Sequence, residues 1–120
     1  MNISEIQHES NAKKLVCTLQ SKLKKILDSI DSKEKISISK INIMIVETNE
    51  SLHALMFAYK KLNNIMSNHS LQKILVVKDS LQKKVTKATK MLPYYDPIKG
   101  NKIMPKSETK LLREILSKSF

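Results

Sequence analysis

Three histidines and one cysteine are the side chains of this sequence best suited to catalysis or metal binding, and their spacing argues against both. His8, His53 and His69 lie in separate segments, and none is close to another histidine or to Cys17. Zinc sites and hydrolytic motifs need such residues a few positions apart. The single glycine also excludes a glycine-rich loop that cradles phosphate. The sequence therefore predicts a protein that is not an enzyme and that binds no cofactor or metal.

Cys17 is the only cysteine, so no disulfide can form within the chain. It falls beside the apolar positions of a predicted helix, and no base is placed to activate it, which predicts a buried or half-buried structural thiol. The N-terminal residues are polar and lack the apolar core of a signal peptide. The longest aliphatic runs, 43–46 and 74–77, are far too short to cross a membrane. We therefore expect a cytoplasmic protein without a transmembrane segment.

Lysines dominate the charge of the C-terminal half. The net charge is +11, and residues 70–120 carry 12 basic and 4 acidic side chains against 10 and 7 in residues 1–69. Lysine suits contact with phosphate groups, whereas the single arginine argues against base-specific reading of nucleic acid. Binding would be nonspecific and sensitive to salt; the alternative is a solvated basic surface. The nucleic acid would lie against the lysine face of the third predicted helix and the C-terminal tail. The candidate nucleic-acid-binding residues on that helix are Lys73, Lys83, Lys84, Lys87 and Lys90.

One glycine among 120 residues indicates a chain with few tight turns, and therefore long helices joined by short links. In residues 12–30, apolar side chains recur every three or four positions, which places them on one face of a helix. A second series continues this spacing from about residue 39 to 66 and predicts one long helix. Its members are Ile41, Ile45, Thr48, Leu52, Leu55, Tyr59, Leu62 and Met66.

Residues 36–46 also admit a strand, because five isoleucines fall close to alternate positions there and β-branched residues favour strands. The alternation slips by one residue between Ile38 and Ile41, which would turn the second half of a strand to the opposite face. The helical interpretation has no such fault. The sequence favours a helix here and leaves the strand as the alternative.

A third helix is predicted over residues 71–92, and the short break at 67–70 requires it to fold back antiparallel on the second. Residues 93–105 hold all three prolines, Gly100, Tyr94 and Tyr95, which predicts a loop or linker. Residues 106–120 then form a short amphipathic helix. The predicted fold is all-α: an antiparallel bundle of three long helices, comprising residues 1–92, plus a short C-terminal helix.

The second helix carries more apolar surface than one neighbour covers, which is typical of a helix at the centre of a bundle. Either the first and third helices flank it, or a partner supplies the missing helix in a homo- or hetero-oligomer. We expect a small adaptor, assembly factor or chaperone whose central hairpin pairs with a helical protein. Nonspecific nucleic-acid binding is the alternative, and binding of the C-terminal helix to anionic membranes is a third. The residues expected to touch a protein partner are Met56, Phe57, Tyr59 and Ile65.

Overall fold

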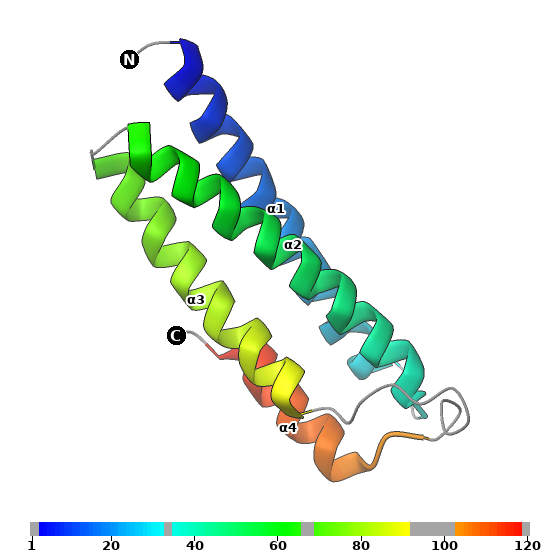
Figure 1. Cartoon of the computed structure of the whole chain (residues 1–120). Helices are drawn as coiled ribbons and strands as arrows, with labels where there is room; N and C mark the ends of the chain where they lie inside the picture. The colour runs from blue at the N-terminus through cyan, green and yellow to red at the C-terminus, as the bar shows by residue number, and fades with distance from the viewer. Residues whose placement is uncertain (1–2, 33–34, 66–68, 92–102, 119–120) are drawn as a thin grey trace.

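Four helices in sequence build an elongated bundle of 51 × 27 × 21 Å (Figure 1). The computed structural model describes residues 3–32, 35–65, 69–91 and 103–118. The first three helices run antiparallel to their neighbours in sequence, and the last returns along the third. This arrangement confirms the all-α prediction of three long helices and a short C-terminal one. The helices are α1 (Ile3–Ser32), α2 (Ile38–Ile65), α3 (His69–Met91) and α4 (Lys106–Ser117).

Helix α2 packs against both α1 and α3, as expected for the most apolar of the long helices. Its predicted apolar series is buried from Ile41 to Leu62, except that Tyr59 is half-buried; Met66 lies outside the described residues. The helix begins at Ile38, so the strand alternative is wrong for residues 38–46, and of residues 36–46 only Ile36 and Ser37 are non-helical. The three-helix bundle therefore closes within one chain, without a partner helix in its centre.

The core is aliphatic and falls into two clusters. The larger one joins α1, α2, α3 and α4, and includes Leu19, Ile26 and Leu55. The smaller one lies where α1, α2 and α3 meet and consists of Ala12, Leu62, Leu71 and Ile74, with half-buried Tyr59 packed against them. Thr48 is a buried polar residue of α2, and its hydroxyl donates to the carbonyl of Met44 at 2.7 Å. This bond satisfies the hydroxyl locally, so the residue fits an apolar seam.

The segments that precede α2 and α4 pair with each other at one end of the bundle. The Met104 amide donates to the Ile36 carbonyl at 2.8 Å, and Ser37 forms an isolated antiparallel bridge with Ile103. The side chains of Ile36 and Met104 are both buried in the main core. This pairing fixes where α4 starts. The predicted linker lies outside the described residues from Pro93 through residue 102, Tyr94 and Tyr95 included.

Helix α4 packs against α1 and α3 and makes no contact with α2 in the described part of the chain. Leu112 and Leu116 enter the main core, and Arg113 Nε donates to Asp31 Oδ1 of α1 at 2.6 Å. Leu112 and Leu116 of α4 are thus buried within the bundle, whereas Leu111 is exposed.

Replacing Leu112 with alanine should release α4 locally, because this fully buried side chain holds α4 against the bundle. We expect amide hydrogen exchange in α4 to accelerate about 30-fold, which corresponds to about 2 kcal/mol. Leu111→Ala is the matched control, since Leu111 is 48% exposed. Equal effects of the two substitutions would show that α4 is not docked as described.

Candidate functional site

The residues best suited to chemistry are dispersed in the structure. His8 is half-buried on α1, and His53 is exposed on α2; the side chain of His69 lies outside the described set. Across residues 3–32, 35–65, 69–91 and 103–118, no three histidine, cysteine or carboxylate side chains converge to hold a metal. Cys17 is exposed, so the prediction of a buried thiol is wrong. A helix turns about 100° per residue, which carries Cys17 from half-buried Val16 to an exposed position on α1.

The four residues expected to touch a protein partner do not share one face. Met56 is half-buried and packs against the main core. Tyr59 is half-buried too, and Lys78 Nζ lies 5.1 Å from the centre of its ring. Phe57 and Ile65 are exposed. Only these last two are therefore accessible on the outer side of α2.

The five candidate lysines of α3 separate into two rows. Lys73 and Lys84 border hollows that α3 forms with α1. Lys83, Lys87 and Lys90 border a different hollow on the outer side of α3. The sequence predicts one basic patch, whereas the structure divides these lysines and places an apolar surface beside Lys73 and Lys84.

A groove runs between α1 and α3 beyond the C-terminal end of α4. It consists of two hollows of about 550 and 410 Å³, both lined by Val77, and Leu116 of α4 closes the wider one. We refer to it as the α1–α3 groove. Its apolar floor consists of Val16, Leu23, Leu27, Ile74, Val77 and Leu81. Its borders carry Lys13, Lys24, Lys73 and Lys84, with Gln20 and Ser80 between them.

The lengths of the helices explain this groove. Helix α4 has 12 residues and spans about 18 Å, whereas α1 has 30 residues and α3 has 23. On α1, Lys13, Val16, Gln20, Lys24 and Leu27 recur at spacings of three and four, so they form one continuous row. Helix α4 covers only the Leu27 end of the trough that α1 and α3 form between them. The rest of this trough is open and constitutes the α1–α3 groove.

The charge of the α1–α3 groove is one-sided. None of the described residues that line its two hollows is acidic. Lys13 pairs with Glu9 of its own helix at 3.3 Å. Within the described residues, no carboxylate lies at ion-pair distance from Lys24, Lys73 or Lys84. Uncompensated lysines beside an apolar floor favour an apolar ligand that carries negative charge.

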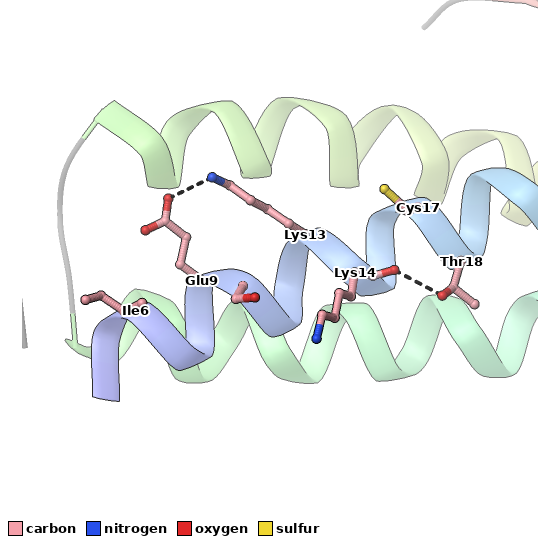
Figure 2. A pocket seen from close by; sticks show the side chains of 7 residues that line it. Ile6, Glu9, Lys13, Lys14, Cys17 and Thr18 are labelled. Atoms are coloured by element: carbon pink, nitrogen blue, oxygen red, sulfur yellow. Dashed lines mark hydrogen bonds and ion pairs between the residues drawn. The ribbon is translucent and has the colours of Figure 1, made fainter. Parts of the chain in front are cut away.

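Another hollow, of about 790 Å³, lies on the outer side of α1, and all seven residues that line it belong to that helix (Figure 2). The Glu9–Lys13 ion pair spans it, and Thr18 donates to the carbonyl of Lys14 at 3.0 Å. A surface on a single helix offers no opposing wall, so it is shallow. Figure 2 shows Cys17 on the side of α1 that faces α3, and this residue also lines the α1–α3 groove.

Comparison with protein-family models, with curated proteins and with solved structures finds no match to this chain. In the described part of the chain, each helix is too short or too polar to cross a membrane.

Proposed function

We propose that this protein is a non-enzymatic helix-binding protein, and that its α1–α3 groove holds an acidic amphipathic helix of a partner protein. The observation that carries this proposal is the position of α4, which fills one end of the trough between α1 and α3 and leaves the other end open. The open part has an apolar floor and lysines along both borders. These features match the two faces of an amphipathic helix.

Helix α4 supports a helix as the ligand, because it already occupies the same trough. It inserts Leu112 and Leu116 between α1 and α3 and adds an ion pair from Arg113 at the border. A partner helix in line with α4 would repeat this pattern. The distance along α1 from Lys13 to Leu23 is about 15 Å, which accommodates about three helical turns.

Charge should select the partner, while apolar burial supplies most of the affinity. An apolar side chain that becomes fully buried contributes about 1.5–3 kcal/mol. A solvent-exposed pair between lysine and carboxylate contributes about 0.2–1 kcal/mol. Glutamates on both flanks of a partner helix would face Lys13 and Lys24 on one border and Lys73 and Lys84 on the other. A helix with basic flanks would be repelled.

This activity belongs to the class of adaptors, assembly factors and chaperones, which cover the apolar face of a helix until it is needed. The docking surface we infer lies on α1 and α3, not on the α2 residues that the sequence first suggests. We place the protein in the cytoplasm, where an exposed thiol such as Cys17 stays reduced.

A labelled synthetic peptide tests this proposal by fluorescence anisotropy. The probe is an amphipathic helix of about 14 residues, with leucines at the i, i+3, i+4 and i+7 positions and glutamates on both flanks. We expect it to bind with saturation. A peptide with the same leucines and lysine flanks is the charge control, and one with serines for leucines is the apolar control. Binding of all three peptides, or of none, would contradict the proposal.

Nonspecific nucleic-acid binding is the second candidate function, and the outer row of α3 is the observation that favours it. Lys83, Lys87 and Lys90 project together from a helix with six lysines and one aspartate. Duplex DNA and single-stranded RNA, titrated at increasing salt, test this candidate. Tight binding that is lost steeply with salt would support it, and no binding at low salt would exclude it.

A further inference from the structure

The outer side of α2 carries a second seam, opposite the one that packs in the core. Its spacings of four and three residues are those of a helix seam in a coiled coil. Every member is exposed, and α2 packs against α1 and α3 alone among the described elements. We call this set the outer seam: Ile43, Glu47, Glu50, Ala54, Phe57 and Lys61.

Large apolar side chains on the outer seam face solvent. Ile43 is 51% exposed and Phe57 is 61% exposed, and Ile65, one turn beyond Lys61, is 41% exposed. Lys61 Nζ lies 4.7 Å from the centre of the Phe57 ring. The lysine covers only part of this ring, because Phe57 stays exposed. Apolar residues repeated along one open helix face indicate an interface more often than scattered ones do.

The order of charges along the outer seam identifies the occupant. The acidic residues Glu47 and Glu50 lie in its first half, and Lys61 lies in its second half with Lys60 next to it in the sequence. Within the described residues, no ion pair involves any of these four side chains. A second copy packed in parallel would place like charges together, whereas an antiparallel copy places opposite charges together at both ends.

We propose that the outer seam binds a second copy of this chain, forming an antiparallel dimer with Ala54 at the two-fold axis. In this register Glu47 of each copy lies opposite Lys61 of the other, and Ile43 lies opposite Ile65. The small side chain of Ala54 permits close approach where the helices cross. The contact is isologous, so it closes at two copies. Helix α2 contributes no residue to the α1–α3 groove, so both grooves stay accessible.

Sedimentation equilibrium on two charge-swapped variants and on the wild type tests the dimer. One variant carries Glu47→Lys and Glu50→Lys, and the other carries Lys60→Glu and Lys61→Glu. We expect the wild type to dimerise, each variant alone to dissociate at least tenfold more readily, and an equimolar mixture of the two to form a heterodimer. This readout does not involve peptide binding, so it stands or fails separately from the proposed function.

Lys83→Glu combined with Lys90→Glu is the matched control for the Lys60→Glu and Lys61→Glu variant, because it makes the same change in net charge on α3 and should leave the dimer intact. Circular dichroism checks that every variant retains its helices. A wild-type protein that stays monomeric at all concentrations would overturn the proposal. A mixture of the two swapped variants that forms no heterodimer would also overturn it.

Discussion

Replacing Leu55 with alanine lowers the free energy of unfolding by about 2–5 kcal/mol, the largest effect we expect from a single substitution. The inner seam of α2 is its core-facing series, Ile41, Ile45, Thr48, Leu52, Leu55, Tyr59 and Leu62. Leu55 is fully buried in this seam, within the cluster that joins all four helices. Truncating the Leu55 side chain leaves a cavity, and the surrounding helices would have to move together to fill it. Small domains have about 5–15 kcal/mol of total stability, so this loss is a large fraction of the whole.

Urea denaturation followed by circular dichroism measures the effect of Leu55→Ala. The midpoint should fall while the slope with denaturant stays unchanged, which is the signature of lost stability alone. His53→Ala is the control, because His53 is exposed on the same helix and its loss should change stability by less than about 0.5 kcal/mol. A similar midpoint for both variants would show that the inner seam of α2 is not the centre of the core.

Reversing the charge of Lys73 and Lys84 together should weaken binding of the acidic amphipathic peptide at least tenfold, about 1.4 kcal/mol or more. Both lysines border the α1–α3 groove. The Lys73→Glu and Lys84→Glu substitutions remove two attractive partners and add two repulsive ones. The same variant should gain affinity for the peptide with lysine flanks. Anisotropy titrations with the two peptides measure both changes.

The matched control again combines Lys83→Glu with Lys90→Glu. These lysines lie on the same helix but border a different hollow, and the net change in charge is identical. Peptide affinity should change much less in the control than in the groove variant. An equal loss in both variants would mean that the total charge of the protein, rather than the groove, controls binding. The control pair should instead be the one that weakens nucleic-acid binding, if such binding occurs.

The helices could be predicted from the sequence because burial imposes a strict period on them. The inner seam of α2 shows that period without interruption, and it outweighed the β-branched residues around Ile41 that suggested a strand. Helix propensity alone would not have decided the case, since packing of the apolar face supplies most of the stability. The fold class followed from this seam and from the scarcity of glycine.

The docking surface could not be predicted in the same way. The α1–α3 groove exists because α4 returns to one particular trough and stops partway, and the pairing of Met104 with Ile36 fixes that return. No local pattern in the sequence encodes this pairing. Rows such as Lys13, Val16 and Gln20 mix charged, apolar and polar residues, so each row by itself resembles an ordinary helix surface. Only their position on two facing helices makes them a groove.

The sequence also could not show which of the apolar residues predicted on α2 are accessible to a partner. Apolar residues cover a wide part of the circumference of α2, and their pattern does not reveal which of them the neighbouring helices bury. Met56 lies next to the inner seam, and Tyr59 is part of it. Exposure in the structure separates them from Phe57 and Ile65. Whether either exposed residue contacts another molecule stays a prediction, which the charge-swapped variants address.

The reactivity of Cys17 tests the central claim of a helix-binding groove most directly. Cys17 is the only thiol in the sequence and it is exposed. It lines the α1–α3 groove beside Val16 and Ile74. The rate of Cys17 alkylation in the wild-type protein therefore measures whether the groove is occupied. We predict that a saturating amount of the acidic amphipathic peptide slows alkylation of Cys17 several-fold, and that the peptide with lysine flanks does not. An acidic peptide that binds fully and leaves the alkylation rate unchanged would place its site elsewhere and contradict the claim.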